Sequence, residues 1–104
     1  MNSNRGITKL SRLTDTEIAD LLPNVPTWEI VEEQGMKRLT RTFQFDDFVT
    51  ALAFTNSVGE IAERHDHHPR IVTEWGRVNV TWWSHEERGI VTTDFDMAMK
   101  IEAL

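Results

Sequence analysis

Three of the four histidines of this chain stand in one short segment, His65-Asp66-His67-His68-Pro69. Imidazole changes its charge near neutral pH, so grouped histidines can donate and accept protons in a catalytic site. Imidazole is also a zinc ligand, and an exposed loop can simply tolerate it. The segment therefore leaves three interpretations open: an acid/base site, a metal site and a solvated loop.

The local spacing argues against the metal site. Zinc sites combine three or four His, Cys or carboxylate ligands, often with two histidines four positions apart. The histidines here are separated by two and three positions, and the chain has no cysteine. We expect no bound metal. On spacing alone, the acid/base site and the solvated loop remain equal alternatives.

The residues next to the histidines can direct the imidazoles. Glu63 and His67 are four positions apart, so both lie on one face if a helix extends that far. A carboxylate in that place can orient the ring and fix its tautomer. Pro69 disfavours helical geometry at the residue before it, so His67 and His68 should point in different directions. Two such side chains can hold two sides of one small molecule.

Two further polar residues stand at the ends of expected elements. His85 ends a β-rich run, and Asp94 begins a helical one. Functional side chains often occupy such positions, because the rigid element behind them holds them in place. We therefore include both among the candidate site residues.

The elements that must position these groups alternate between two hydrophobic periods. Thr14 and Glu17 form a capping-box pattern that predicts a helix over about 15–22. A period of two over 28–45, with Gly35 at a turn, predicts a hairpin. Helical spacing returns over about 47–64. The β-rich runs 71–75 and 77–83 flank Gly76, and Thr93 with Asp96 three positions later predicts the start of a last helix.

This order predicts an α+β fold, a four-stranded antiparallel sheet with three helices packed on one face. A length of 104 residues favours one domain, 1–104, in which residues 1–10 form a loose start. Trp82 and Trp83 are neighbours in an expected strand and must face opposite sides of the sheet. One tryptophan can enter the core, and the other needs a cover such as a partner subunit or a ligand.

Composition excludes several classes of function. The formal net charge is −6, which argues against electrostatic binding of nucleic acid. We find no apolar run long enough for a membrane helix and no signal peptide. The absence of cysteine fits a reducing compartment, so we expect a cytoplasmic protein.

A longer pattern favours the acid/base interpretation. Glu63, His67-His68-Pro69, Trp75, His85 and Asp94 stand at spacings that resemble the signature of pterin-4a-carbinolamine dehydratases. The resemblance runs from about residue 21 to the C-terminus. It includes Trp28 before the first strand pair, FQFDDF before the long helix and SHEERGIVTTDFDMA near the end.

The resemblance implies the same α+β fold and one reaction. In this family, 4a-hydroxytetrahydropterin loses water to give quinonoid dihydropterin, without metal, flavin or nucleotide. The substrate arises when an aromatic amino acid hydroxylase uses tetrahydrobiopterin or a related pterin, so such a hydroxylase is a possible partner. The resemblance also implies oligomers, which form through a sheet edge or through the long helices. We expect a homodimer or homotetramer with the Val78–Ser84 strand or the long helix at the interface.

Roles carried over from the family are as follows. His67, His68 and His85 surround the reacting carbon as catalytic residues. Asp94 is expected to hold the imidazole of His85, and Glu63 that of His67. The residues expected at the substrate, with Trp28 at the rim of the pocket, are Glu63, Trp28, Pro69 and Ser84.

The chain departs from the family at two positions near the site. Trp83 replaces a small or hydroxyl residue, and Arg70 stands where Glu is frequent. Relatives of this fold also act without catalysis, as a dimerisation cofactor of a transcription factor or as assembly factors. A chain kept only for binding is free to lose its histidines, and this chain retains them. We therefore favour the enzyme over the binding partner.

Overall fold

The computed structural model describes residues 11–104, and the expected loose start over 1–10 lies outside this part. Two short helical segments come first, α2 (Asp15–Leu21) and the 3-10 helix η1 (Leu22–Asn24). A hairpin, a long helix, a second hairpin and a last helix follow. They are β1 (Glu29–Glu33), β2 (Met36–Gln44), α3 (Phe48–His65), β3 (Arg70–Glu74), β4 (Arg77–Trp82) and α4 (Thr92–Glu102).

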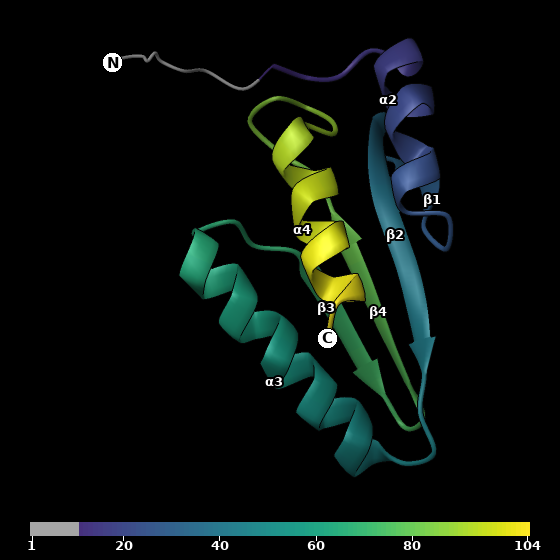
Figure 1. Cartoon of the computed structure of the whole chain (residues 1–104), viewed down its shortest axis with the longest axis vertical. Coiled ribbons are helices and arrows are strands. Elements are labelled where there is room, and N and C mark those ends of the chain that lie inside the picture. Colours follow the sequence, from purple (N-terminus) through teal and green to yellow (C-terminus); the bar gives the residue numbers. More distant parts are fainter. Residues whose placement is uncertain (1–10) are drawn as a thin grey trace.

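The four strands form one antiparallel sheet in the order β1-β2-β4-β3. The three α-helices lie over the same face of this sheet (Figure 1). The expected α+β fold, with its three helices on one face, is confirmed. The sheet edges are β1 and β3, whereas β4 lies between β2 and β3. The expectation that the Val78–Ser84 strand forms a sheet-edge interface is therefore wrong, because both sides of β4 are already paired.

Backbone geometry explains the turns and caps. Gln34 and Gly35 both have positive φ, 53° and 75°, which suits the right-handed twist of a tight hairpin. Thr14 and Glu17 form the expected capping box of α2. Asp47 caps α3 by accepting a hydrogen bond from the Thr50 backbone N–H.

The start of α4 differs from the prediction. The helix begins at Thr92, and its cap is Val91 rather than Thr93. Asp94, not Asp96, accepts a hydrogen bond from the Val91 backbone N–H at 2.9 Å. The pattern of Thr93 and Asp96 misled the prediction because the Asp94 side chain already satisfies this helix end.

The core lies between the helices and the inner face of the sheet. Its strand residues include Leu39, Val78, Val80 and Trp82. The buried residues of α3 are Ala51, Val58, Ile61 and Ala62, and the apolar ones of α4 are Phe95, Met97, Ala98 and Ile101. Phe48 and Leu52, which share the helical period of α3, remain about two-fifths exposed at 44% and 43%. They leave an apolar surface on α3 that residues 11–104 do not cover.

The two adjacent tryptophans face opposite sides, as alternation in a strand requires. Trp82 is fully buried in the core. Trp83 faces away from the helices and is partly covered within the same chain. The guanidinium of Arg38 lies 3.8 Å from its ring centroid, and that of Arg70 lies 5.5 Å away. These cation–π contacts cover part of the ring, which stays half-buried, so the expectation of a partner subunit or a ligand as a further cover remains a prediction.

Candidate active site

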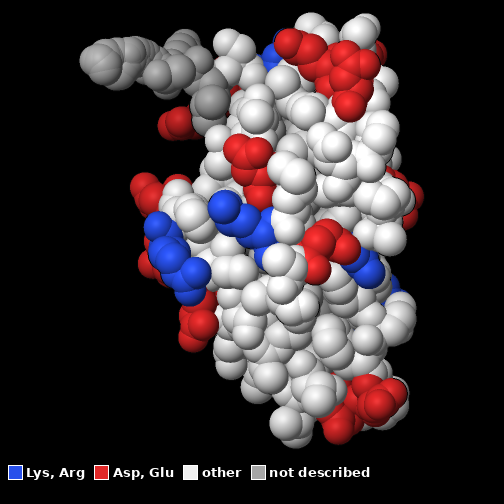
Figure 2. Space-filling model, viewed as in Figure 1, with Lys and Arg blue, Asp and Glu red and all other residues white. Residues whose placement is uncertain are grey.

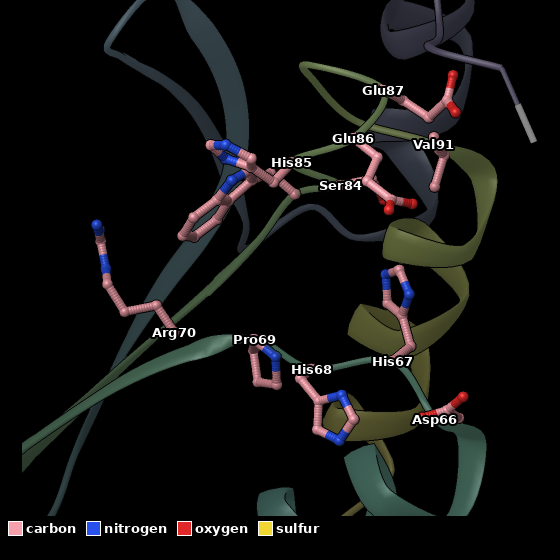
Figure 3. A pocket seen from close by; sticks show the side chains of 11 residues that line it. Asp66, His67, His68, Pro69, Arg70, Ser84, His85, Glu86, Glu87 and Val91 are labelled. Carbon is pink, nitrogen blue, oxygen red and sulfur yellow. The ribbon is translucent and has the colours of Figure 1, made fainter.

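A cavity of about 800 Å³ opens at one end of the sheet, where the segment after α3 meets the loop after β4. His67 and His68 come from the first segment and His85 from the second, so the two segments face each other across the opening (Figure 3). The cavity is lined by Asp66, His67, His68, Pro69, Arg70, Trp83, Ser84, His85, Glu86, Glu87 and Val91. The structure thus brings together three histidines that the sequence places up to 18 positions apart.

The end of α3 separates the directions of His67 and His68. Asp66 adopts the left-handed conformation, with φ 49°, and its backbone N–H caps the helix on Ala62 and Glu63 carbonyls. This residue turns the chain away from the helix axis, and Pro69 then prevents a return to helical geometry. The side chain of His67 is 19% exposed and that of His68 is 54% exposed. One imidazole therefore turns toward the core and the other toward solvent.

His67 is fixed by two contacts. Its ring stacks on that of Trp82, with the centroids 5.7 Å apart and an angle of 9° between the planes. Its Nε2 lies 2.5 Å from Oδ1 of Asp94. Asp94 has no exposed surface. A carboxylate oxygen accepts hydrogen bonds, so this contact favours the His67 tautomer with its proton on Nε2 and leaves Nδ1 as the nitrogen available to a ligand.

The buried carboxylate of Asp94 is shared by three donors. Oδ2 accepts a hydrogen bond from the Val91 backbone N–H at 2.9 Å and a longer one, at 3.4 Å, from the Ser84 hydroxyl. Oδ1 accepts a hydrogen bond from Nε2 of His67. Burying a carboxylate is costly unless it is hydrogen-bonded, and these contacts offset that cost. Asp94 thus ties the histidine segment, the end of β4 and the start of α4 together.

His68 has a carboxylate partner of its own, in a more exposed setting. Its Nε2 lies 2.5 Å from Oε2 of Glu63, whose side chain is exposed. The expected pairings are therefore exchanged. Asp94 contacts His67 rather than His85, and Glu63 contacts His68 rather than His67. The chain reversal at Asp66 is the cause, because it ends the helical relation between Glu63 and His67 on which the prediction depended.

His85 stands on an exposed loop of defined shape. A bridge between Ser84 and Gly89 closes this loop, and Arg88 has a φ of 60° within it. Within residues 11–104, the His85 side chain makes no hydrogen bond to another side chain or to the backbone. Both of its ring nitrogens are therefore available to a bound molecule.

Of the expected substrate-binding residues, Pro69 and Ser84 line the cavity, and Glu63 reaches its edge through His68. Trp28 does not line it, and the expectation that Trp28 stands at the rim is wrong for this chain. It is buried against Phe43, and its indole N–H donates to Glu102 on α4 at 2.9 Å.

Sequence reasoning missed several residues of the cavity wall. Trp83 and Arg70 were noted only as departures from the family, and Glu86 and Glu87 only as part of the segment SHEERGIVTTDFDMA. All four line the cavity. Their closeness in the sequence could have identified them, because each stands within two residues of His68 or His85.

An ion cluster supports the wall at Trp83. Glu33 contacts Arg70 through both carboxylate oxygens, at 2.9 and 3.3 Å, and Arg38 at 3.2 Å. The hydrogen bonds from Arg70 lower the pKa of Glu33, and those to Glu33 raise the pKa of Arg70. Both groups are therefore charged at neutral pH, and the two arginines are held against the indole.

Among residues 11–104, no three His, Asp, Glu or Cys side chains lie close enough to hold a metal ion. No helix in the described part of the chain is long and apolar enough to cross a membrane. On the face seen in Figure 2, basic side chains are interspersed with acidic ones.

Comparison with known sequences gives a consistent result. Residues 11–104 match the model of the family described as pterin 4 alpha carbinolamine dehydratase. A protein of Chlorobium limicola, named provisionally as a pterin-4-alpha-carbinolamine dehydratase, is 55% identical over 94 residues, which cover 90% of this chain and 83% of that protein. A protein of Nitrosococcus oceani with the same provisional name is 50% identical over 93 residues, covering 89% of this chain and 82% of that protein.

Two solved structures resemble the fold. A transcriptional coactivator/pterin dehydratase from Brucella melitensis superposes with a TM-score of 0.81 at 38% identity, covering 89% of this chain and 97% of that one. A pterin dehydratase-like protein identified as a RuBisCO assembly factor superposes with a TM-score of 0.61, covering 77% of this chain and 90% of that one. At 18% identity, the second likeness shows the fold alone.

Proposed function

The chain belongs to the pterin 4 alpha carbinolamine dehydratase family, and we propose that it removes water from a 4a-hydroxytetrahydropterin to give quinonoid dihydropterin. The observation that carries this proposal is the cavity itself. It gathers three histidines from two segments and has a buried carboxylate behind one of them. Such a set supplies proton donors and acceptors around one small molecule.

The reaction needs only proton transfers. The bond between carbon 4a and the hydroxyl oxygen breaks, and that oxygen leaves as water after it receives a proton. Nitrogen 5 loses a proton, and its electron pair forms the double bond to carbon 4a. One imidazole must therefore donate a proton and another must accept one, and each such transfer typically contributes roughly 10²–10⁴-fold. The proposal requires no metal or other cofactor.

The structure suggests how the work is divided. Nδ1 of His67 and of His68 are the nitrogens left for substrate, because the Nε2 atoms contact Asp94 and Glu63. His85 faces these two histidines from the other segment. It has no carboxylate partner within residues 11–104, so it can donate or accept a proton without breaking such a contact. Trp83, Pro69 and Ser84 line the same cavity and offer contact surface for the pterin ring. We assign substrate binding to these three residues.

Turnover of a chemically generated 4a-hydroxytetrahydropterin by the purified protein tests the proposal. We expect the absorbance of the 4a-hydroxytetrahydropterin to disappear much faster with the protein than without it. In the His67→Ala/His85→Ala double variant, the rate should fall back to the uncatalysed one. A rate equal to the uncatalysed one, with folded protein, would show that the cavity does not serve this reaction.

The rival is a binding protein that uses the same fold. The names of the Brucella and RuBisCO-associated structures give such roles to those proteins. The buried Asp94 aligned on His67 favours the enzyme, because a carboxylate there orients the imidazole and fixes its tautomer for proton transfer. The same turnover assay decides between the two, since a binding protein shows no rate above background.

The wider setting follows from the substrate. A 4a-hydroxytetrahydropterin arises from a pterin-dependent hydroxylation, so a hydroxylase of aromatic amino acids is the proposed source. We place the protein in the cytoplasm as a homo-oligomer. Two surfaces support self-association: the unpaired edge of β3, which carries Val72, and the exposed side chains Phe48 and Leu52 on α3.

A further inference from the structure

We infer that the cavity selects pterins with an uncharged side chain, and that Glu33 determines this selectivity by withholding Arg70 from the ligand. The inference rests on the proposed function and deepens it, because it names the class of pterin. Glu33 does not line the cavity and acts on the ligand only through Arg70. It is therefore a specificity-determining residue and not a catalytic one.

The charges that line the cavity are predominantly negative. Asp66, Glu86 and Glu87 contribute three carboxylates, and Arg70 contributes one guanidinium. With the histidines left out of the count, three negative charges against one positive charge leave a net charge of −2. An anionic group on the ligand meets this charge unfavourably, whereas a neutral hydroxyl or alkyl group does not. The lining thus disfavours a carboxylate or phosphate on the pterin side chain.

Arg70 is the one cation among the lining residues in the described part of the chain, and it is already engaged. Both of its terminal nitrogens bind the Glu33 carboxylate, at 2.9 and 3.3 Å. A bidentate pair of this kind uses the planar fork that would otherwise bind a ligand carboxylate. Figure 3 shows the Arg70 side chain directed away from His67 and His68.

Both members of the pair are charged at neutral pH, and a second arginine supports Glu33. The hydrogen bonds from Arg70 lower the pKa of Glu33, so the carboxylate stays ionised at neutral pH. Arg38 also binds Glu33 and is almost completely buried over Trp83. Glu33 and Arg38 carry opposite charges, so the support behind the wall leaves the net charge of the lining unchanged. Glu33 is therefore the residue whose removal releases Arg70.

The test compares two probes with the same ring: 6-hydroxymethylpterin, which has a neutral side chain, and pterin-6-carboxylate. Their dissociation constants are measured by calorimetry with the complete protein. We expect the neutral probe to bind about five- to tenfold more tightly, as two net charges at the rim of a solvated cavity produce. Added salt should reduce this ratio, because screening weakens repulsion between exposed charges.

Two variants identify the residues responsible. Glu33→Gln should tighten pterin-6-carboxylate binding severalfold and leave 6-hydroxymethylpterin within about twofold, because Arg70 becomes available. The double variant Glu86→Gln/Glu87→Gln should also reduce the ratio of the two dissociation constants, because it removes two carboxylates that repel the carboxylate of the probe. The control is Glu29→Gln, an exposed position on the same strand as Glu33 with the same change in net charge. The control should keep the wild-type ratio.

The outcomes separate this inference from the proposed function. Equal affinity for the two probes, alongside normal turnover, overturns the charge selectivity and leaves the dehydratase intact. Binding of neither probe, with no turnover, overturns both. If Glu33→Gln does not fold, the Glu86→Gln/Glu87→Gln variant still decides, and an unchanged ratio in it contradicts the inference.

Discussion

His67 and Asp94 are 27 positions apart in the sequence, yet Nε2 of one lies 2.5 Å from a carboxylate oxygen of the other. The first residue follows α3, and the second is in the opening turn of α4. The same carboxylate accepts the Val91 backbone N–H that begins α4. The Asp94 carboxylate therefore caps a helix and also orients an imidazole, so this one residue serves both the fold and the proposed site.

Asp94→Asn should lower turnover about ten- to a hundredfold, the range typical of residues that orient a functional imidazole. The amide still accepts the Val91 N–H, so we expect the fold to persist, with a small loss of stability. Because Asn cannot fix the His67 tautomer as a carboxylate does, the pH profile of kcat should also change shape. Asp96→Asn, exposed on the same helix, is the matched control. A variant with normal kcat and an unchanged pH profile would restrict Asp94 to helix capping.

Single replacement of His67, His68 or His85 by Ala should cut turnover at least about tenfold, equivalent to about 1.4 kcal/mol of barrier. The fourth histidine gives a natural control. His65 is exposed at the end of α3 and does not line the cavity, so His65→Ala should keep the wild-type rate. Three folded variants with wild-type turnover would show that the acid/base assignment is wrong.

Much of the fold could be predicted from the sequence, because it depends on local patterns. The capping box at Thr14, the turn at Gly35 and the change of period near Asp47 all describe interactions between near neighbours. The order of the strands in the sheet does not depend on such local patterns. Nothing local indicates that β4 lies inside the sheet, so the expectation that it forms a sheet-edge interface was wrong.

The site shows the same division. The spacing of the histidines indicated which residues meet, and the cavity gathers them. The partners of the imidazoles were exchanged, because the left-handed Asp66 redirects the chain by an amount that no spacing encodes. The stacking of Arg38 on Trp83 joins β2 to the end of β4, and this pair depends on strand order. Trp28 was misplaced for a related reason, since its Glu102 partner lies 74 positions away.

Activity should survive exhaustive treatment with a chelator such as EDTA. The proposed reaction moves protons only, and the local spacing of the histidines suits zinc poorly. The measurement is turnover after dialysis against chelator and then against metal-free buffer. A loss of activity on chelation that zinc restores would replace the proposed acid/base mechanism with a metal-dependent one.

Glu102 should stabilise the fold in a pH-dependent way. Burial raises its pKa, but hydrogen bonds from Arg41 and Trp28 outweigh this effect, so the pKa lies below the ordinary value of 4.5. A lowered folded-state pKa gives stability that is present above the unfolded value and lost as pH falls through the folded one. Glu102→Gln should therefore cost about 1 kcal/mol at neutral pH and progressively less as the pH falls below the ordinary value of 4.5. Thermal unfolding of the wild-type protein and of the Glu102→Gln variant, measured from acid to neutral pH, tests this prediction. A difference in stability that does not change with pH would contradict the ionic role of Glu102.

Self-association should depend on surfaces that this chain leaves uncovered. The edge of β3 presents unpaired backbone groups beside Val72, and Trp75 at its end is 72% exposed. Edges of this kind are commonly paired, and apolar surface on a helix is commonly covered. We expect at least a dimer at micromolar concentration. Val72→Lys should weaken an edge-paired dimer and Leu52→Lys a helix-paired one, because each places a charge where the partner would exclude water.

Sedimentation velocity measures both variants against Thr16→Lys, an exposed position on α2 that adds the same charge away from either surface. The variant that dissociates identifies the interface in use. If only Leu52→Lys dissociates, α3 alone forms the dimer and β3 remains an open edge. A wild-type protein that sediments as a monomer would remove the homo-oligomer from the proposal while leaving the cavity complete, because every residue assigned to it comes from one chain.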